Sequence, residues 1–440
     1  MKHLACLSGV LAVTLLACGA PPEADTAPVP LPSEEALLPS EELVPVATAW
    51  SYLERGVVYA GNRRSSVVAV DRLGNSYVLA SFNTAGGSKS SLLAFDPTGQ
   101  QRWRRDFSAP LDGDNGQFDV STDFWGNVLI VGSSVPRLDL GNGPLGKRAF
   151  VAKFSSTGSL LWQRPLCDNA RVTAVTTDAY GAVWFGGTVG NGCNIGGGPL
   201  WEITIGGEQG FIAKFDALGE YVFSRAIGGR GDSVSVQDLA VTSDNGVVVV
   251  GGRYVFAESQ LIRPYISKFA SNGPHRWFRD YPEAYGDFWG AEVDNGRIVV
   301  AGYYSLNFTF KGVNHPAFSQ FGDGLVLAYT ESGGEDWIQH LGCWAKSVSA
   351  RAGQVAVLAS SCSRSMSFPE SVEVAGKDGV LALYQANGTP VRLRGIGKWH
   401  SSGWDVALSP LGVATVTGNE NIQPDDTWYK TDLSVFSLMP

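Results

Sequence analysis

Short apolar strands alternate with glycine turns along most of this chain. In the commonest pattern an apolar strand ends in Phe or Tyr, a Gly turn follows, and an aromatic residue comes four positions after the Gly. The full pattern occurs as FDPTGQQRW, FSSTGSLLW, FDALGEYVF, FASNGPHRW and YTESGGEDW, starting at Phe95, Phe154, Phe215, Phe269 and Tyr329. A sixth copy, YQANGTPVR from Tyr384, keeps the Gly and lacks the aromatic. Such a repeat predicts an all-β fold of repeated units, a β-propeller.

A second pattern places a glycine turn between two apolar strands ahead of each of these units. These glycines are 50 to 65 residues apart, at Gly74, Gly126, Gly181, Gly246, Gly296, Gly353 and Gly412. Glycine accepts the positive φ that tight hairpins require, and the Val runs that follow it indicate buried strands. The spacing predicts a seven-bladed β-propeller over residues 46–440, with roughly four strands in each blade.

The last unit of the repeat is incomplete, because the chain ends at Pro440 where a glycine turn and an aromatic strand would follow. The segment VATAWSYLERG around Trp50 precedes the first hairpin and has no turn of its own. We expect this N-terminal strand to close the last blade as its outermost strand. Closure of this kind removes the free edges of an open ring.

The recurrent aromatic residue has two interpretations. It is suited to stacking on a bound sugar or quinone, and equally to packing between adjacent blades. A ring that recurs at one strand position in every unit favours packing between blades.

Composition and charge exclude some classes of partner. The chain has 440 residues, of which 17% are charged, and its net charge is −9. Residues 18–45 are rich in Pro and Ala and hold no basic residue, so they predict an extended, disordered acidic tether. Without that tether the remaining chain is nearly neutral and has no basic cluster, so nucleic-acid binding is not expected.

The N-terminus predicts an exported lipoprotein. Lys2 precedes an apolar run, Leu4 to Ala17, which is too short to span a bilayer as a helix. The run ends in LLAC and resembles a bacterial lipobox, which implies removal of residues 1–17 and acylation of Cys18. Gly19 after the Cys favours the outer membrane by the sorting rule of that family. The alternative is an ordinary signal peptide with an incidental Cys.

Four further cysteines occupy equivalent positions in the repeats. Cys167 and Cys343 each follow an aromatic strand, and Cys193 and Cys362 each follow the second hairpin strand of the next unit. This equivalence predicts the disulfides Cys167–Cys193 and Cys343–Cys362, as expected in an oxidising compartment. Metal binding is the alternative, but no CxxC pair or nearby His supports it.

Catalytic motifs are not evident. The histidines lack metal-ligand spacing, and neither GxSxG nor HExxH occurs. Residues 112–116 (DGDNG) resemble part of a calcium loop without its later Glu, and a turn between blades is the favoured interpretation. The sequence therefore predicts no catalytic residue, no metal and no cofactor.

The best candidate binding surface is the longer insert from Tyr303 to Phe321. It offers several aromatic rings and one imidazole beside amides, a combination that suits glycans or peptides. The alternative is that these rings pack the insert onto its blade. The candidate binding residues are Tyr303, Tyr304, Phe308, Phe310, His315 and Phe318.

The unit from Gly210 to Gly252, together with FVAKFSSTG and LDLGNGPLG, resembles the SBBP-type bacterial propeller repeat. The resemblance covers roughly residues 46–440 and implies the fold far more strongly than an activity. FDPTGQQRW also resembles the Trp-docking motif of quinone-dehydrogenase propellers, but the adjacent cysteines and the Ca²⁺ site of those enzymes are not apparent here. The same motif style occurs in the propeller lipoprotein of the outer-membrane barrel-assembly machinery.

These observations lead to a hypothesis with two alternatives. The leading hypothesis is a monomeric, lipid-anchored propeller at the outer membrane that binds a protein or glycan and touches the membrane only through its anchor. The alternatives are a scaffold for outer-membrane assembly, and a hydrolase or lyase with acids in the central channel. Channel carboxylates with raised pKa values would favour an enzyme, and an aromatic rim would favour binding.

Overall fold

The computed structural model describes thirteen segments of the unit Ala47–Pro440. Their regular secondary structure consists of β-strands, and none of the chain they cover forms a helix long and apolar enough to cross a membrane. The segments are residues 50–54, 66–84, 87–107, 109–111, 118–134, 136–200, 209–228, 231–255, 261–317, 322–360, 379–396, 402–421 and 431–438.

The strands form antiparallel sheets in which neighbours along the chain are usually neighbours in the sheet. The first three sheets are β2 (Ser66–Val70), β3 (Ser76–Thr84), β4 (Gly87–Phe95) and β5 (Gln101–Phe107); β6 (Asp119–Thr122), β7 (Val128–Ser133), β8 (Ala149–Phe154) and β9 (Leu160–Pro165); and β10 (Ala170–Thr177), β11 (Val183–Val189), β12 (Gln209–Phe215) and β13 (Tyr221–Ile227).

Two five-stranded sheets follow, and then a regular one. They are β14 (Asp232–Val234), β15 (Asp238–Val241), β16 (Val247–Val255), β17 (Ile262–Phe269) and β18 (His275–Asp280); β19 (Ala284–Asp294), β20 (Arg297–Phe310), β21 (Val313–Pro316), β22 (Asp323–Thr330) and β23 (Glu335–Leu341); and β24 (Trp344–Arg351), β25 (Gln354–Ser360), β26 (Gly379–Gln385) and β27 (Pro390–Ile396).

The remaining sheet joins the two ends of the described chain. It has the order β1–β30–β29–β28, in which β1 (Ser51–Glu54) pairs antiparallel with β30 (Thr431–Leu438) as the outermost strand. The other two strands are β28 (Ser402–Leu408) and β29 (Ala414–Asn421).

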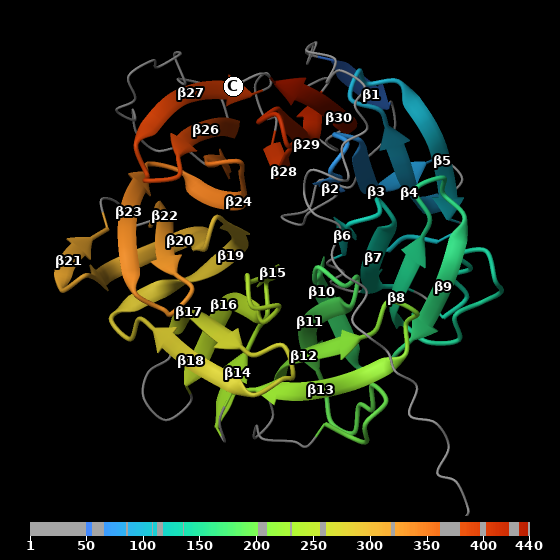
Figure 1. Cartoon of the computed structure of the whole chain (residues 1–440), viewed down its shortest axis with the longest axis horizontal. Helices are drawn as coiled ribbons and strands as arrows, with labels where there is room; N and C mark the ends of the chain where they lie inside the picture. The colour runs from blue at the N-terminus through green and yellow to red at the C-terminus, as the bar shows by residue number, and fades with distance from the viewer. Residues whose placement is uncertain are drawn as a thin grey trace, which may run out of the picture. The chain divides into compact units, whose positions relative to one another are not determined.

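The innermost strands close a ring, as Figure 1 shows. β2 contacts β6, and contacts continue in order through β10, β15, β19, β24 and β28 back to β2. Radially arranged antiparallel sheets around a central axis define an all-β β-propeller.

The expected ring of seven equivalent four-stranded blades is wrong. The chain forms six continuous blades, two of which have five strands, and the composite sheet of β1 and β28–β30 completes the ring. The departures have local causes. In one blade the innermost strand is divided into β14 and β15, and in the next β20 extends into an additional hairpin with β21.

The hairpin turns follow from an aspartate and a glycine at fixed positions. Between β6 and β7, Asp123 Oδ1 accepts hydrogen bonds from the backbone N–H groups of Trp125 and Asn127, each at 2.9 Å. Gly126 in the same turn has a φ of 77°, which a residue with a Cβ rarely adopts. Asx turns of this kind end one strand and start the next in a set direction.

The recurrent Trp lies between blades, as predicted. Trp162 on β9 packs on Gly219 in the next blade, where an added Cβ would lie 2.8 Å from the Trp162 ring. Trp162 Nε1 donates a hydrogen bond to the carbonyl of Ala217 at 3.2 Å, and Arg164 Nε donates to the Gly219 carbonyl at 2.8 Å. Equivalent Trp–Gly contacts join Trp103 to Gly158, Trp277 to Gly333 and Trp337 to Gly388. The predicted structural role of this aromatic is confirmed.

The apolar core lies between neighbouring sheets and not inside any one of them. One cluster combines residues of the first two blades, including Leu79 and Phe150, and another combines the second and third blades, including Val131 and Phe185. Each blade is therefore stabilised by burial against both neighbours, which makes ring closure essential to stability.

Candidate functional site

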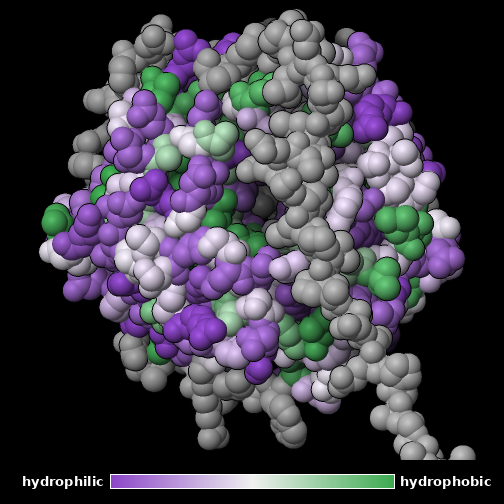
Figure 2. Space-filling model, in the orientation of Figure 1, coloured by the Kyte–Doolittle hydropathy of each residue, from purple (hydrophilic) through white to green (hydrophobic). Residues whose placement is uncertain are grey.

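A cavity of about 430 Å³ runs along the axis of the ring, lined by all the innermost strands. Figure 2 shows one face of the molecule, hollowed near the middle of the ring and mostly hydrophilic around it. The volume is in the range of small-molecule sites. The cavity wall carries six carboxylates and two guanidinium groups: Asp119, Asp123, Asp238, Glu292, Asp294, Asp405, Arg72 and Arg351.

Three of these aspartates hold the ring together. Asp119 Oδ2 accepts a hydrogen bond from the Val175 N–H at 2.8 Å, and Asp238 Oδ2 accepts one from the Ala291 N–H at 2.9 Å. Asp405 Oδ2 accepts one from the Val68 N–H, also at 2.8 Å. In each case the donor belongs to the innermost strand of the next sheet, so these carboxylates link neighbouring blades.

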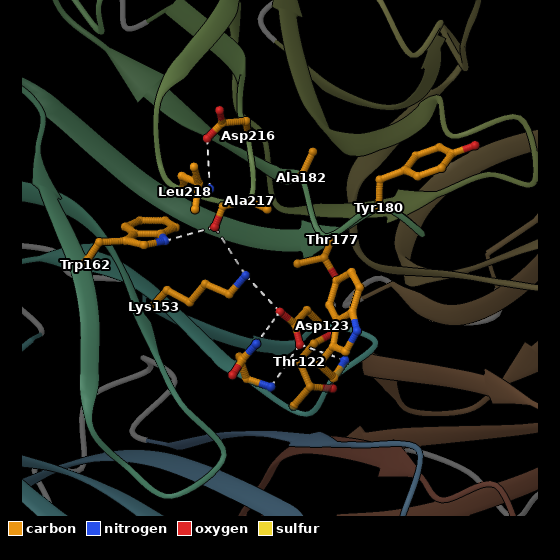
Figure 3. Close-up of polar contacts among 12 residues, drawn as sticks. Thr122, Asp123, Lys153, Trp162, Thr177, Tyr180, Ala182, Asp216, Ala217 and Leu218 are labelled. Atoms are coloured by element: carbon orange, nitrogen blue, oxygen red, sulfur yellow. Dashed lines mark hydrogen bonds and ion pairs between the residues drawn. The ribbon is translucent and has the colours of Figure 1, made fainter. Parts of the chain in front are cut away.

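A fourth carboxylate, Asp123, is neutralised by a buried ion pair. Lys153 Nζ lies 2.8 Å from Asp123 Oδ2, and both side chains are almost fully buried. In Figure 3, Lys153 also points toward the carbonyl of Ala217, at 3.5 Å, which is the carbonyl that Trp162 binds. Lys214 and Asp178 repeat the pair in the next blade at 2.8 Å. Breaking such a pair would leave an uncompensated buried charge.

Glu292 differs from the other acids of the cavity. It pairs with Val299 of β20, at the position where Ser121 of β6 pairs with Leu129 of β7. The equivalent residues of the other innermost strands are all uncharged and small: Ala69, Ser121, Thr176, Ala240, Ser349 and Ala407. Of the seven equivalent positions on the described innermost strands, only that of Glu292 holds a charged side chain.

The environment of Glu292 disfavours its ionised form. Burial, helped by the charges of Asp238 and Asp294, raises the pKa of Glu292 to about 8, against the opposing effects of the Val293 N–H and the Arg351 guanidinium. Its hydrogen bond to a described residue is long, from the Val293 N–H to Oε1 at 3.4 Å. Arg351 Nη1 instead donates to the carbonyls of Val70 and Leu408, at 3.1 and 3.3 Å.

An aromatic triad lies on the innermost strands β19 and β24 and on β20, the strand next to β19. Trp289 of β19, Tyr303 of β20 and Trp344 of β24 are each half-buried. The ring centroids of Trp289 and Tyr303 are 4.6 Å apart, and those of Tyr303 and Trp344 are 5.3 Å apart. Lys346 Nζ lies 4.0 Å from the Trp289 ring centroid, which is a cation–π contact.

A carboxyl and an amide lie beside this triad. Gln237 Nε2 donates a hydrogen bond to Asp287 Oδ2 at 2.9 Å. Burial raises the pKa of Asp287 to about 7, against the hydrogen bonds from Gln237 and Trp289 that lower it. Asp287 therefore exchanges its proton near neutral pH, beside three partly exposed rings.

The predicted binding residues of the insert are divided between core and surface. Tyr304, Phe308 and Phe310 are buried in the core of their blade, so their rings pack the insert as the alternative interpretation proposed. Tyr303 alone belongs to the aromatic triad. His315 on β21 lies apart from it, and Phe318 is outside the described residues.

His315 contacts a second histidine. His340 Nε2 on β23 lies 3.1 Å from His315 Nδ1, and the two imidazoles share a hydrogen bond. Burial and the neighbouring His315 lower the pKa of His340 to about 4. Within the described segments, no group of three or more His, Cys, Asp or Glu side chains is placed to hold a metal ion.

One predicted disulfide is confirmed. Cys167 and Cys193 are bonded, with their Cα atoms 5.8 Å apart. Cys362 lies outside the described residues, so the Cys343–Cys362 pairing stays a prediction, and the same holds for acylation of Cys18. The calcium-like loop at 112–116 also lies outside them.

Sequence reasoning missed Glu292, Trp289 and Trp344. A signal for Glu292 was present, since a lone Glu stands in AEVDNG where the other units place Ala, Ser or Thr. No feature of the sequence distinguished Trp289 and Trp344, because neither lies in an insert. They come close to Tyr303 only in the folded chain, where β19 pairs with β20 and contacts β24.

Comparison with known proteins shows the same fold class. The chain is similar to a chain of the mitotic checkpoint complex, with 10% identity, a TM-score of 0.52 and coverage of 98% of this chain and 99% of that one. It is also similar to the polysaccharide lyase Uly1, with 11% identity, a TM-score of 0.51 and coverage of 90% and 95%. Similarity to BamB from Moraxella catarrhalis is weaker, with 12% identity, a TM-score of 0.39 and coverage of 84% of each chain.

No protein-family model matches the chain, and no curated protein matches it at the sequence level. At these identities the similar structures show the fold alone. The chain is a β-propeller.

Proposed function

We propose that this propeller is a glycan-binding module whose site is the aromatic triad of Trp289, Tyr303 and Trp344. The main support is that three partly exposed rings from two blades meet beside polar groups. These are the carboxyl of Asp287, the amide of Gln237 and the ammonium group of Lys346. Aromatic faces cover the C–H faces of sugar rings, and polar groups at the edge bind the hydroxyls. Rings held on the paired strands β19 and β20 and on the adjacent β24 are preorganised for such contacts.

The state of the cavity acids supports binding over hydrolysis. Asp119, Asp238 and Asp405 each accept a backbone hydrogen bond that closes the ring, and Asp123 is paired with Lys153. A hydrolase or lyase needs an acid and a base within reach of one substrate bond. Glu292 has a raised pKa, but the neighbouring acids are engaged in an ion pair and in hydrogen bonds that link the blades, so they do not supply the second catalytic group.

The cellular setting belongs to the same proposal. The lipobox-like LLAC at Cys18 supports a lipid-anchored protein at the outer membrane, lifted from the lipid by the acidic tether. The SBBP-type repeat supports a place among propeller lipoproteins of that kind. Labelling with a radioactive fatty acid tests the anchor, and Cys18→Ser is expected to abolish the label.

Binding to a glycan array, followed by calorimetry on the full-length protein in detergent, tests the site. Trp344→Ala and Trp289→Ala should each weaken binding at least 10-fold, because each removes one face of the site. Trp125→Ala is the matched control, since Trp125 is an exposed Trp in the turn between β6 and β7. Absence of glycan binding by the unaltered protein, or an equal loss in Trp125→Ala, would overturn the proposal.

A further inference from the structure

The central cavity contains one carboxyl that the fold does not use. The aspartates of the wall link blades or pair with Lys153, whereas Glu292 projects from β19 at a level where the other innermost strands carry Ala, Ser or Thr. Glu292 is half-buried, and a carboxyl withdrawn from water in this way costs stability unless a partner compensates it. The other blades hold a small residue at this position, so the fold itself does not require a Glu there. A bound ligand that compensates its charge would explain its presence.

Among the described residues, the contacts of Glu292 leave one of its carboxylate oxygens, Oε2, without a hydrogen bond. Its long hydrogen bond from the Val293 N–H, at 3.4 Å, engages only Oε1. The nearest guanidinium, that of Arg351, directs Nη1 to the carbonyls of Val70, Asp71 and Leu408. Arg72, the other cation of the wall, stacks on Phe124 with its guanidinium carbon 4.2 Å from the ring centroid.

The charges that face Glu292 favour a cation. Asp238 on β15 and Asp294 on β19 both disfavour its ionisation, whereas the Val293 N–H and the Arg351 guanidinium on β24 favour it. A field that opposes one more negative charge stabilises a positive one at the same place. The cavity, at about 430 Å³, has room for an alkyl ammonium chain.

We propose that the central cavity binds a protonated primary amine, with the carboxylate of Glu292 as its counter-ion. The site is distinct from the aromatic triad and does not depend on glycan binding. The amine is supplied either by a free polyamine or by a lysine side chain of a protein that docks over the channel, and the chemistry at Glu292 is the same for both.

Binding should be coupled to loss of a proton. Near pH 7 the Glu292 carboxyl is mostly protonated, and an ammonium group binds the ionised form. Affinity should therefore rise about 25-fold between pH 6.5 and 8.5, following the ionised fraction of a carboxyl with a pKa of about 8. Close to one proton should be released for each amine bound at pH 7.

Titration calorimetry with spermidine and with a short acetylated, amidated lysine peptide tests the site on the full-length protein. Measurements in two buffers of different ionisation enthalpy give the number of protons released. Glu292→Gln preserves the shape of the side chain and should weaken amine binding at least 10-fold and abolish proton release. Glu283→Gln, at an exposed Glu outside the cavity, is the matched control.

The two probes separate the sources of the amine. Binding of spermidine alone assigns the site to free polyamines, binding of the peptide alone assigns it to a protein lysine, and binding of both shows that the amine itself is recognised. The proposal is wrong if neither probe binds, or if Glu292→Gln binds as tightly as the unaltered protein with the same proton release. Glycan binding by Glu292→Gln is measured alongside. If this variant still binds glycan but not amine, only the amine site is lost, and the fold and the proposed function are intact.

Discussion

Trp50 of the N-terminal strand stacks on Phe95 of the first continuous blade, with ring centroids 5.3 Å apart. Its indole also lies against Gly99, where an added Cβ would be 2.3 Å from the ring. This is the contact that Trp162 makes with Gly219 elsewhere, so Trp50, directly before β1, is the interblade aromatic of the composite sheet. Glu54 adds an ion pair to Arg104 at 2.7 Å.

We therefore expect Trp50→Ala to destabilise the ring by about 3 kcal/mol, the lower end of the cost of removing a packed Trp. Deletion of residues 46–54 should cost more, because it also exposes the edge of β30. Thermal or denaturant unfolding measures both. An unchanged melting temperature after the deletion would show that β1 does not close the ring.

Gly219 provides a second test of the contact between blades. Its φ of 80° and the Trp162 ring both oppose a Cβ. Gly143 has a similar φ of 86°, and nothing lies within 4 Å of its Cβ position. Gly143→Ala should therefore cost about 1 kcal/mol from backbone strain alone, and Gly219→Ala clearly more. Equal losses in denaturant unfolding would mean that the Trp contact adds nothing.

Much of this arrangement was predictable because it depends on local chemistry. Asp–x–x–Gly turns such as that at Asp123 form from side-chain hydrogen bonds within five residues, and they recur in the first three blades, at Asp71 and Asp178 for example. The interblade position of Trp162 followed from repetition alone. The equivalence of Cys167 and Cys193 with positions in other units likewise predicted a bond between them.

The candidate site was less predictable because it depends on contacts between distant strands. Tyr303 and Tyr304 are neighbours with the same side chain, yet one joins the triad and the other is buried in the core. Successive residues of a strand point to opposite faces, but which face is covered depends on the β20–β21 hairpin and on β24. The division of β14 from β15 likewise has no counterpart in the repeat.

The Cys167–Cys193 disulfide should contribute about 3 kcal/mol, as expected for a loop whose ends are 26 residues apart. The double variant Cys167→Ala, Cys193→Ala measures this by denaturant unfolding, and reduction of the unaltered protein should give a loss at least as large. Peptide mapping without reduction tests the second pairing. Recovery of a peptide joining Cys167 to Cys343 would contradict both assignments.

Glu292 also gives the free protein a specific dependence of stability on pH. Its pKa is about 8 in the folded state, above the ordinary value of 4.5, so the folded state holds a proton that the unfolded state has lost between those values. Stability from this group is therefore complete at low pH and falls as the pH rises toward 8, by at most about 1.4 kcal/mol per pH unit.

Two other groups act at lower pH and in opposite directions. Asp287, with its pKa raised to about 7, also lowers stability as the pH rises toward 7. His340, with its pKa lowered to about 4, stays neutral when folded, so its contribution is present above pH 6.5 and is lost as the pH falls toward 4. Between pH 7 and 8 the change should come mainly from Glu292.

Melting temperatures measured from pH 4 to 8.5 test this assignment. Glu292→Gln should remove the decline between pH 7 and 8, while Asp287→Asn should only make the decline below pH 7 less steep and leave that above pH 7 largely intact. His340→Gln should weaken the loss of stability on the acid side. A decline above pH 7 that persists in Glu292→Gln would show that another group titrates there, and that the cavity carboxyl is already ionised in the free protein.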